Sequence, residues 1–580
     1  LVFSDRVIVP IAHHAAMEPH ACVAVCDLKN KISVYTPIQN IYPCRVVLSK
    51  VLNLPMNKIR VVKPPMGGSF GGKQEVCLEP VAALLALKTK RPVKLVLNRR
   101  ETMVSTRTRH AVIANIKSAV TSRGEILAQD LEILTTPGAY ASSAMAIPYA
   151  MCHKFFRLYR IPNLRFKGVP VYTNTPIAGA MRGYGSTQLI FALETHFNRI
   201  AKELHLDPVE FRLKHVVRPG DKDPRTCISL GNCRVADCLE KGRDLFQWHN
   251  RQTIRSGRFR KGHGVACCLH GNGIYPTHYD MTTMTLKLNE DGTASLLTGT
   301  ADLGTSCTTA FTQIIGEVLG IEPNNIEVLE ADTDFTPYDI GCFTSRSIWV
   351  AGNAAKKVAE AVLEQLQQEA GKMLNLPAER FKAKDNYLYY LDNCSIQVSL
   401  EDIVNYAMQK SYRDIIATET YRSMAASCPP YGAHFAEVEV DTFTGKVRVL
   451  EYVAAHDIGK AINPLAVEGQ IEGAVQMGIG LATMEKLEID KKSGKITNAN
   501  FKKYPLIKAK DMPKPKILLV EEGEEPGPYG AKSIGEVAVV PAPAAIINAI
   551  SDALGVNFFH MPVTVKDVIE VCTNANNAGG

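Results

Sequence analysis

Apolar and polar residues alternate along several stretches of the chain, and this period of two predicts β-strands. The first such run is Leu1–Val9, and the next two are Lys31–Thr36 and Asn57–Lys63. Residues 91–175 alternate in the same way between short turns, which predicts an antiparallel sheet. The first half of the chain is therefore expected to be rich in strands.

Other stretches repeat their apolar residues every three to four positions, and this spacing predicts helices. Several of these helices follow directly after a strand and a glycine-rich or hydroxyl-rich turn. The same order of strand, turn and helix start therefore repeats along the chain. Met284–Leu288 and Ala294–Thr298 are spaced as a hairpin. The predicted helices are Glu75–Lys88, residues 187–204, Ala310–Leu319, Ala351–Gln368, a glycine-containing segment around Gln470–Gly480, and Val537–Leu554.

The periodic pattern is interrupted once, near the middle of the chain. Between Lys241 and Lys261 the sequence turns polar and basic and shows little period, so we place a boundary there. A chain of 580 residues exceeds a single compact core. The boundary divides it into residues 1–245 and 246–580, each large enough to bury a core of its own.

Charge and composition narrow the possible functions. The net charge of +8 is small for this length, and the basic residues cluster only between Arg251 and Lys261, which is typical of a solvated linker and not of a nucleic-acid site. We find no charged and apolar leader and no apolar run near the ~18–20 residues of a membrane span. No nucleic-acid or membrane partner is therefore expected. Because the chain starts with Leu1 inside a strand-like run, we expect a subunit or a fragment.

The 15 cysteines do not follow the spacing of a zinc or iron–sulfur site. Most of them are expected to be buried thiols. So many free cysteines favour a reducing compartment, and we expect a cytoplasmic protein. Any iron–sulfur cluster must then belong to a partner chain.

Gly527–Glu536 is a glycine-rich turn that places one carboxylate directly before the predicted helix Val537–Leu554. Its glycines permit backbone angles that side chains forbid and leave N–H groups free to face a ligand. At the positive end of a helix dipole, Glu536 is expected to stay ionised, which suits a general base. The alternative is that this carboxylate only stabilises its own helix.

Gly67–Lys73 is a glycine loop between a strand and a helix start, an arrangement that binds phosphate. Its spacing also satisfies Gly-x-x-x-x-Gly-Lys, so a nucleotide-binding P-loop is an alternative. Gln74 stands where a P-loop needs Ser or Thr for magnesium, and Phe70 would crowd the phosphates. The P-loop is disfavoured. A metal site in the histidine-rich segment His13–His20 is disfavoured as well, because its spacing matches no metal motif.

A second glycine loop, Ala178–Ser186, carries Arg182 and Tyr184. A guanidinium between glycines suits bidentate contact with an anion, and the adjacent ring can stack on a planar ligand. The alternative is an ordinary surface arginine.

Three further junctions of a turn with a helix start lie in the second half, at Asp302–Ser306, Gly341–Ser347 and Asp457–Pro464. Backbone N–H groups and hydroxyls at helix starts suit anionic oxygen. Together with the two glycine loops they make five junctions, which are too many for one mononucleotide. They predict a long, multiply anionic cofactor between the two halves.

Several of these motifs together resemble the large, molybdopterin-binding subunit of the xanthine dehydrogenase and aldehyde oxidase family. They are the loop Gly67–Lys73, the segment Ala180–Gly185, the segment Asp457–Gln470 and the turn Gly530–Glu536. The resemblance extends from near the N-terminus to about Leu554. It implies an α+β fold in which two large elongated domains clasp a molybdopterin cofactor.

The resemblance also implies roles for individual residues. Glu536 would be the catalytic base, while Gln39, Phe70 and Arg182 would surround the molybdenum centre without binding the metal directly. Thr305 stands in place of a glutamine of the family. The implied cofactor-binding residues are Gln39, Gly68, Ser69, Phe70, Arg182, Gly304, Thr305, Thr344, Ser345, Arg346, Ser347, Gln470 and Gly535.

By resemblance, the chain is a molybdenum hydroxylase subunit that oxidises an electron-poor carbon with water as the oxygen source. Its cofactor would be molybdenum–molybdopterin, in the cytosine dinucleotide form. Electrons would leave to 2Fe–2S centres and FAD on partner chains, because this chain has no motif for either. We therefore expect an iron–sulfur subunit and an FAD subunit, in a dimer of heterotrimers.

Gln74, Tyr184 and Ala150 are the residues expected to face the substrate. Animal xanthine-oxidising relatives carry a glutamate and an arginine at the positions of Gln74 and Ala150, so that charged pair is absent here. Gln74 can still exchange hydrogen bonds with a heterocycle, and Tyr184 offers a ring face to a flat substrate. We predict a purine or a related N-heterocycle as substrate.

Other functions are also compatible with the sequence. An aldehyde or an aromatic-acid derivative of the nicotinate or hydroxybenzoyl-CoA type is the alternative substrate. Carbon monoxide dehydrogenase is disfavoured because the loop around Arg182 lacks its cysteine. A non-catalytic interaction subunit is the remote alternative, since Glu536 and the loop glycines are all present.

Overall fold

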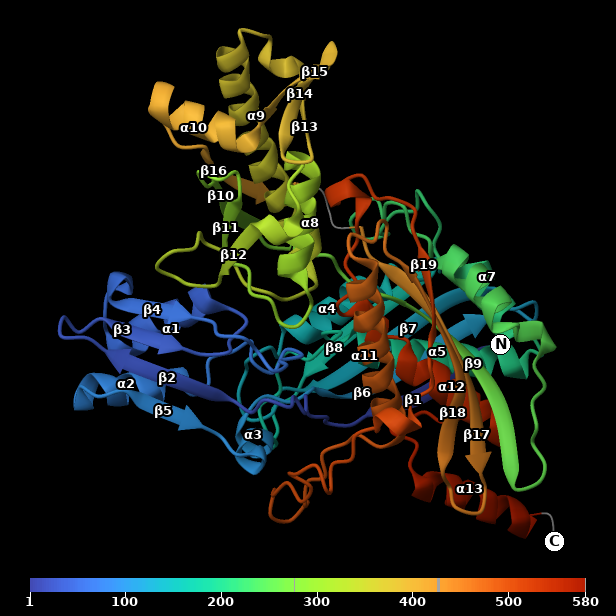
Figure 1. Ribbon diagram of the computed structural model, residues 1–580. Helices are drawn as coiled ribbons and strands as arrows, with labels where there is room; N and C mark the ends of the chain where they lie inside the picture. The colour runs from blue at the N-terminus through green and yellow to red at the C-terminus, as the bar shows by residue number, and fades with distance from the viewer. Residues whose placement is uncertain (276, 425–427, 579–580) are drawn as a thin grey trace.

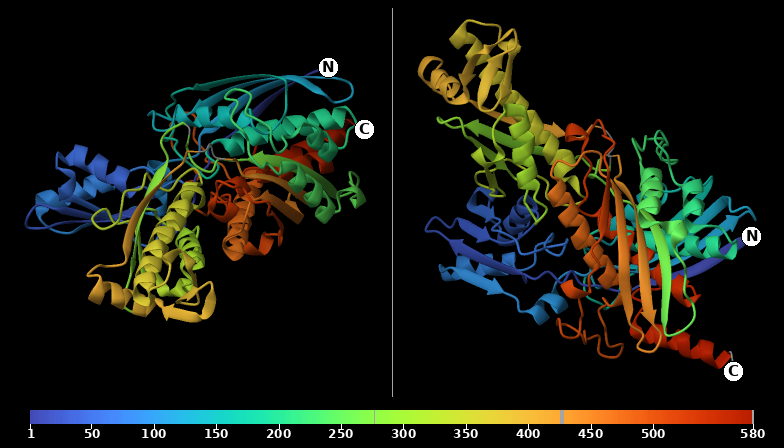
Figure 2. Two further views of the ribbon diagram at one scale, coloured as in Figure 1. Left: turned by 90° about the horizontal axis from the view of Figure 1, so that it is seen from above. Right: turned by 45° about the vertical axis from the view of Figure 1, so that its right-hand side comes forward.

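The computed structural model describes residues 1–275, 277–424 and 428–578, which form a large body carrying two lobes (Figure 1). The small lobe comprises residues 21–97, and the helical lobe comprises residues 281–422. Figure 2 shows that both lobes project from the side of the body that lies away from the two termini. Helices and strands occur in all three parts, so the expected α+β class is confirmed.

The first sheet of the body has the strand order β1-β6-β7-β8. β1, β6 and β7 pair antiparallel, whereas β8 runs parallel to β7. The buried residues of β1 alternate strictly with exposed ones, as its sequence pattern predicts. The four strands are β1 (Val2–Val9), β6 (Ala111–Val120), β7 (Ile126–Thr136) and β8 (Asn163–Pro170).

The second sheet of the body has the order β19-β18-β17-β9. Three of its four strands, β9, β17 and β18, pair antiparallel, and β19 lies parallel to β18. The inner ends of β9, β17 and β18 are buried on both faces, which explains their continuous apolar runs. The strands are β9 (Phe259–Leu269), β17 (Tyr431–Asp441), β18 (Val447–Asp457) and β19 (Lys516–Val520).

Helix α12 lies at the centre of the body, against β9 and β17 and beside α5 and α11. Its side chains are almost all buried, and many of them are alanines. Gly262 and Gly264 of β9 make this close packing possible, because a Cβ at either position would lie 2.3 Å from backbone atoms of α12. The helices of the body are α3 (Arg99–Ser105), α4 (Ala146–Phe155), α5 (Ser186–Glu203), α6 (Pro208–His215), α7 (Val235–Phe246), α11 (Pro464–Thr483), α12 (Ala542–Leu554) and α13 (Val565–Ala578).

The small lobe is a four-stranded sheet of order β4-β3-β2-β5 with two helices. The predicted strands at Lys31–Thr36 and Asn57–Lys63 are confirmed with slightly shorter bounds. Its elements are β2 (Ala21–Cys26), β3 (Ile32–Tyr35), α1 (Ile41–Leu52), β4 (Ile59–Val62), α2 (Glu79–Thr89) and β5 (Val93–Val96).

The helical lobe combines a four-stranded sheet, β12-β11-β10-β16, with the three-stranded sheet β13-β14-β15. The predicted hairpin is confirmed, because Met284 to Leu288 pair antiparallel with Thr298 to Ala294. The elements are β10 (Met281–Leu288), β11 (Ala294–Thr298), α8 (Cys307–Leu319), β12 (Ile326–Glu330), α9 (Gly352–Leu374), β13 (Phe381–Lys384), β14 (Tyr387–Tyr390), β15 (Asn393–Ser399), α10 (Leu400–Lys410) and β16 (Ile416–Arg422).

The hydrophobic cores do not follow the order of the sequence. The core of the body joins residues from Phe3 to Trp248 with residues from Val265 to Cys572. The helical lobe has its own core, and that of the small lobe also takes in Ala301, Ala331 and Cys342. The division into residues 1–245 and 246–580 stays a prediction, and the packing of the body crosses it.

Two details of the predicted elements are wrong. Residues 91–175 are not purely antiparallel strands, because they include α3, α4 and the parallel partners β7 and β8. The helix expected to start at Val537 begins only at Ala542, after a 3₁₀ turn over Val537–Val539. Pro541 and Pro543 have no N–H group to donate, which confines them to the helix start.

The expectation that no apolar run reaches the length of a membrane span is also wrong. Within the described residues, Val537–Leu554 is long and apolar enough by length and composition. However, 94% of this segment is buried inside the protein, as expected of a core helix.

A buried ion pair between Glu194 of α5 and Arg212 of α6, at 2.7 Å, holds the body together beside β9. Glu194 also accepts hydrogen bonds from the Tyr159 hydroxyl and the Cys267 backbone N–H. We expect Glu194→Ala to lower the free energy of unfolding by about 3–5 kcal/mol, because it leaves Arg212 buried without its partner. Chemical denaturation measures this loss.

The matched control is Glu203→Ala on the same helix, where the carboxylate is exposed and pairs with Arg199. An exposed pair contributes about 0–1 kcal/mol. Equal effects of the two substitutions would contradict the assignment of Glu194 as a structural anchor.

Candidate active site

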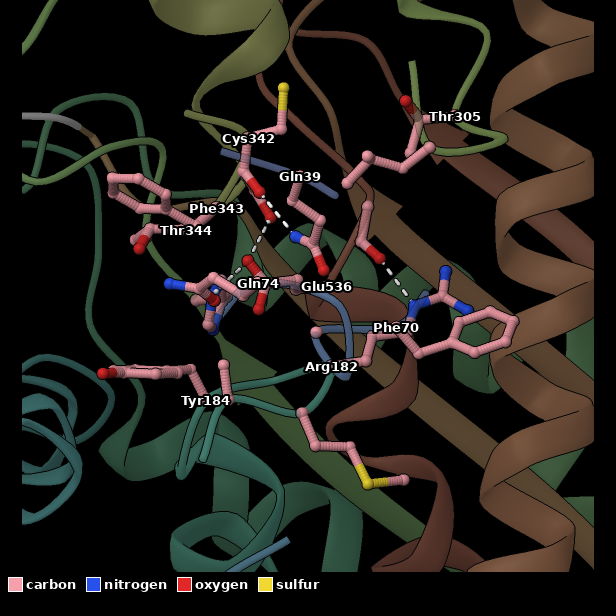
Figure 3. A pocket seen from close by; sticks show the side chains of 18 of the residues that line it. Gln39, Phe70, Gln74, Arg182, Tyr184, Thr305, Cys342, Phe343, Thr344 and Glu536 are labelled. Atoms are coloured by element: carbon pink, nitrogen blue, oxygen red, sulfur yellow. Dashed lines mark hydrogen bonds and ion pairs between the residues drawn. The ribbon is translucent and has the colours of Figure 1, made fainter. Parts of the chain in front are cut away.

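A cavity of about 910 Å³ opens among the body, the small lobe and the helical lobe. Figure 3 shows Tyr184 and Phe343 on one side of it and Phe70 and Thr305 on the other, with Glu536 between them. Most of the predicted site residues line this cavity: Gln39, Phe70, Gln74, Ala150, Arg182, Tyr184, Thr305, Thr344, Ser345, Ser347, Gln470, Gly535 and Glu536. The fold thus brings together residues separated by up to 497 positions, from Gln39 to Glu536.

Four predicted cofactor-binding residues do not line the cavity: Gly68, Ser69, Gly304 and Arg346. Of the five junctions, Asp457–Pro464 also lies outside the cavity lining and reaches it only through α11. The Asp457 carboxylate instead accepts a hydrogen bond from Lys532 at 2.8 Å. These groups support the site and do not face it.

Glu536 is held by close contacts from three distant segments. Its Oε1 accepts from the Gly183 N–H at 3.1 Å, and its Oε2 accepts from the Ser345 hydroxyl at 2.9 Å. His270 Nε2 lies 3.1 Å from Oε2. The carboxylate is therefore fixed in place by the second glycine loop, the 341–347 segment and the end of β9.

Burial alone would raise the pKa of Glu536, but its neighbours outweigh this effect. His270, the Ser345 hydroxyl and the charge of Lys154 together hold the pKa of this carboxyl below its usual range. The expected ionised state is confirmed. The cause differs from the predicted one, because Glu536 precedes a 3₁₀ turn and not the first turn of α12.

His270 and Lys154 were missed in the sequence, and both belong to this site. Burial lowers the pKa of His270, so that the ring is a neutral partner near pH 7, and its Nδ1 lies 3.0 Å from the Ser186 hydroxyl oxygen. Lys154 comes from α4, a helix that the alternating pattern concealed. Lys154 lies in no glycine-rich motif, so no local signal marked it. His270 directly precedes the turn Gly271-Asn272-Gly273 at the end of β9, and this glycine-rich turn is the signal that could have found it.

Arg182 connects three of the segments that form the cavity. Its Nε donates to the Gly535 carbonyl at 2.6 Å, and its Nη2 donates to the carbonyl and side-chain oxygens of Gln470, both at 3.0 Å. Its own N–H donates to the Phe70 carbonyl at 2.8 Å. Among the described residues Nη1 has no hydrogen-bond partner, so this nitrogen remains available to a ligand. The alternative of a surface arginine is excluded by burial.

The first glycine loop is not a P-loop. The Lys73 ammonium is buried and pairs with Glu18, away from the cavity. His14 Nε2 lies 2.7 Å from the Ala180 carbonyl, and His20 Nε2 lies 3.0 Å from the Gly72 carbonyl. The histidines therefore support the glycine loops, and His14 also lines the cavity.

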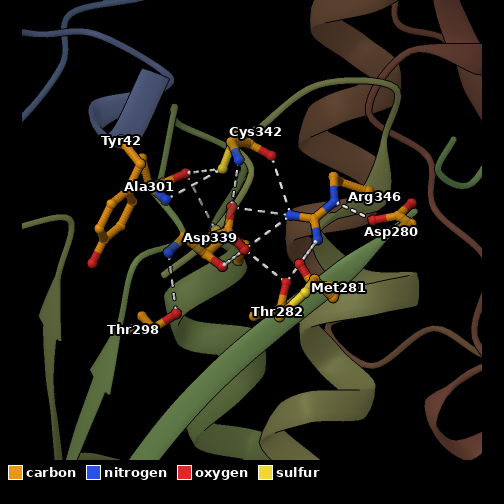
Figure 4. A network of polar contacts seen from close by, with 12 residues as sticks. Tyr42, Asp280, Met281, Thr282, Thr298, Ala301, Asp339, Cys342 and Arg346 are labelled. Carbon is orange, nitrogen blue, oxygen red and sulfur yellow. Dashed lines mark hydrogen bonds and ion pairs between the residues drawn. The ribbon is translucent and has the colours of Figure 1, made fainter. Parts of the chain in front are cut away.

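Arg346 is an internal anchor of the 341–347 segment, and its predicted contact with the cofactor is wrong (Figure 4). Its Nε donates to Asp280 at 2.8 Å, and its Nη1 donates to Asp339 at 2.9 and 3.0 Å and to the Gly341 carbonyl. Nη2 donates to the Met281 carbonyl and the Thr282 hydroxyl, both at 2.7 Å. All donors of the guanidinium are therefore occupied within the protein.

The residues around the cavity fit a long cofactor. A Cβ at Gly469 or Gly473 of α11 would have no atom within 4 Å, so the helix presents bare backbone to open space. Phe70, Thr344 and Ser345 line the cavity with φ of 53°, 50° and 52°, a strained conformation that clusters at functional sites. Together with the free Nη1 of Arg182, these groups can hold a phosphorylated, elongated ligand.

Two matches to family models cover most of the chain. Residues 1–216 and residues 241–513 each match a molybdopterin cofactor-binding domain. The fold and the cavity therefore define a molybdopterin-binding oxidoreductase subunit.

Sequence similarity to known proteins indicates the same family. The chain is 34% identical over 568 residues to the putative xanthine dehydrogenase molybdenum-binding subunit XdhA of Escherichia coli, covering 97% of this chain and 76% of that one. It is 29% identical to the aldehyde oxidoreductase molybdenum-binding subunit PaoC of the same organism, covering 97% and 74%. The chain belongs to the molybdenum-binding subunits of the xanthine dehydrogenase and aldehyde oxidase family, and it is a molybdenum-containing oxidoreductase.

Solved structures show a similar fold. Quinoline 2-oxidoreductase from Pseudomonas putida 86 superposes with a TM-score of 0.92 at 25% identity, over 99% of this chain and 76% of that chain. The aldehyde oxidoreductase from Desulfovibrio gigas superposes with a TM-score of 0.87 at 26% identity, over 99% and 61%.

We expect Glu536→Gln to lower kcat by about 10²–10⁴-fold, because the variant keeps the size of the side chain but removes the base. Molybdenum content, measured by elemental analysis of the purified complex, should stay unchanged. Glu472→Gln is the control, because Glu472 is an exposed glutamate of α11 that does not line the cavity. Near-normal turnover of Glu536→Gln would mean that the carboxylate is only structural.

Arg182→Ala should behave differently and lose molybdenum as well as activity. The substitution disconnects Gly535, Gln470 and the second glycine loop, and it removes the free Nη1 from the cavity. Elemental analysis should find a clear decrease in molybdenum per chain. The control is Arg165→Ala on β8, an exposed arginine paired with Asp130. Full molybdenum content in Arg182→Ala would exclude this role.

Proposed function

We propose that this chain is the molybdenum-binding subunit of a complex that hydroxylates a purine or a related N-heterocycle. The observation that carries the proposal is the ionised Glu536 in a cavity that also presents the Tyr184 ring and the Gln74 amide. The names of two relatives support it. One is the putative xanthine dehydrogenase subunit of Escherichia coli, and the other is a probable xanthine dehydrogenase subunit of Bacillus subtilis, which is 30% identical to this chain.

The net reaction converts a C–H bond and one water molecule into a C–OH group, two protons and two electrons. When bound, the molybdenum cofactor supplies the redox chemistry and accepts the two electrons. Glu536 is the base that takes up one of the protons at its carboxylate. Gly183 and Ser345 hold that carboxylate in place, so the base needs little reorganisation before it acts.

The substrate side of the cavity suits a flat heterocycle. The ring of Tyr184 lines the cavity and can stack on the substrate ring. Tyr184 lies in the tight glycine loop with a positive φ of 36°. The side-chain amide of Gln74 makes no hydrogen bond to the described residues, so it can both donate to and accept from ring nitrogens and carbonyls. An aldehyde needs none of these contacts.

The electrons must leave the chain, and we propose that they pass to 2Fe–2S centres and FAD on two partner subunits. Names of relatives as molybdenum-binding subunits support the presence of other subunits. The cytosine dinucleotide form of the cofactor, the dimer of heterotrimers and the cytoplasmic location remain part of this proposal.

The alternative substrate is an aldehyde or an aromatic-acid derivative, which the similarity to PaoC favours. The test offers hypoxanthine, xanthine, nicotinate and benzaldehyde to the purified complex with an artificial electron acceptor. We expect oxidation of hypoxanthine and xanthine. Oxidation of benzaldehyde alone would overturn the purine assignment.

Gln74→Ala provides a second measurement in the same assay. We expect kcat/KM for xanthine to fall roughly tenfold, as for the loss of one hydrogen bond of about 1.4 kcal/mol. The rate with benzaldehyde, which offers a ring but no ring nitrogen, should stay within about twofold. A similar decrease for both substrates would show that Gln74 shapes the cavity and does not recognise the heterocycle.

A further inference from the structure

Lys154 is a lysine of α4 whose side chain lines the cavity although the residue is only 7% exposed. It lies one helical turn after Ala150, which lines the same cavity. The helix packs beside the second glycine loop, because the nearest atoms to a Cβ at Gly185 belong to Met151 and Ile147 of α4. Lys154 therefore belongs to the side of the cavity that carries Tyr184.

The ammonium group of Lys154 has no hydrogen bond and no ion pair with any described residue. Its neighbours His153 on α4 and Arg157 just after α4 cannot pair with the ammonium group. Arg157 lies in an ion pair with Asp223 at 2.6 Å, and His153 Nδ1 lies 2.9 Å from Nη2 of Arg225. Burial and Arg225 lower the pKa of His153 to about 4, so this ring is neutral. A buried charge without a partner is costly, which indicates that a ligand completes the site.

Glu536 is not that partner. Its carboxylate already has Gly183, Ser345 and His270 as close neighbours, and Lys154 forms no ion pair with it within 4.0 Å. Nevertheless the two charges are near enough to affect each other electrostatically. The base and the ammonium group are thus close but separated, and the open space they share is part of the cavity.

The cofactor is not the expected partner either. The free Nη1 of Arg182 is the cationic donor available to the cofactor, and Arg182 lies with Phe70 and Thr305 opposite Tyr184 (Figure 3). Of the predicted cofactor-binding residues labelled there, Thr344 lies on the side of Tyr184, and it offers a hydroxyl and no charge. We propose that Lys154 binds a negatively charged or strongly polarised exocyclic oxygen of the substrate and so orients the reacting carbon toward Glu536. This inference rests on the proposed function and narrows the substrate class to flat rings that carry an oxo, oxido or carboxylate oxygen.

The charge state of Lys154 adds a measurable consequence. Burial lowers its pKa to about 8, with Glu536 opposing and Arg157 assisting the shift. The ammonium group is therefore charged below pH 8 and loses its proton above it, whereas in the unfolded chain it stays charged up to about pH 10.4. Between these values the unfolded chain binds more protons, so this group opposes folding at neutral pH and opposes it less as the pH rises.

The test uses the purified complex and two substrates that differ only in one exocyclic oxygen, hypoxanthine and purine. Lys154→Met keeps the length of the side chain and removes the charge. We expect kcat/KM for hypoxanthine to fall about 10–100-fold more than the value for purine, as expected for a lost charged hydrogen bond. Any loss that acts through the pKa of Glu536 is common to both substrates and cancels in this ratio. Lys154→Arg should restore part of the preference, and Lys167→Met, an exposed lysine of β8, is the control.

Two further readouts separate binding from a structural role. The wild-type kcat/KM for hypoxanthine should decrease above about pH 8, and Lys154→Met should lack this decrease. Molybdenum content should be unchanged, and the thermal midpoint of Lys154→Met at pH 7 should be equal to or higher than that of the wild type, because a buried unpaired charge is removed. A lower midpoint with equal losses for both substrates would overturn the proposal.

The same design separates this inference from the proposed function. If the wild-type complex oxidises benzaldehyde but neither hypoxanthine nor purine, the proposed function fails. The matched pair of substrates is then 4-carboxybenzaldehyde and benzaldehyde. Selective loss of the carboxylate substrate in Lys154→Met would then still support an oxygen-binding Lys154. If Lys154→Met lowers kcat/KM equally for both substrates of the pair that the wild type oxidises, the inference fails while the proposed function stands.

Discussion

The site depends on keeping one half-buried carboxylate ionised inside an enzyme cavity. Desolvation opposes this state, so Glu536 needs donors that are already in place. The donors are the Gly183 N–H and the Ser345 hydroxyl, and the His270 ring lies close beside them, so the contacts come from three separate segments. The second glycine loop, the 341–347 segment and the end of β9 must therefore converge, and much of the remaining architecture serves to bring them together.

Two buried guanidinium groups hold the segments in position by different means. Arg346 uses all its donors on Asp280, Asp339 and nearby oxygens, so it fixes the 341–347 segment within the helical lobe. Arg182 instead spans between segments, from its own loop to Gly535 and Gln470, and keeps one nitrogen for the cavity. A planar, always charged group suits both tasks, because its donors point in fixed directions.

The cavity lies where separate hydrophobic cores meet, and this placement fits its use. The body supplies the base and most of its donors, the helical lobe supplies Thr305 and the 341–347 segment, and the small lobe supplies Gln39 and the first glycine loop. Loops between rigid cores can present backbone N–H groups and strained residues without losing buried hydrogen bonds. One cavity can then hold both a long cofactor and a small substrate.

The sequence by itself determined the elements whose physical cause is local. Alternation predicted the strands, and glycine with adjacent charged or hydroxyl residues predicted the loops of Phe70, Arg182 and Glu536, because turn conformation and helix starts depend on nearby residues. Only the tertiary structure decided the partners. Lys154 stands in no motif, and α4 was hidden in an alternating stretch with Pro148 in its first turn. His270 precedes a glycine-rich turn that leads into no helix, so nothing nearby indicated that its ring meets Glu536. The resemblance of its segment implies a cofactor contact for Arg346, yet its guanidinium points inward to Asp339. Burial and most of these contacts depend on residues far apart in the sequence, and no local pattern encodes which of them will meet.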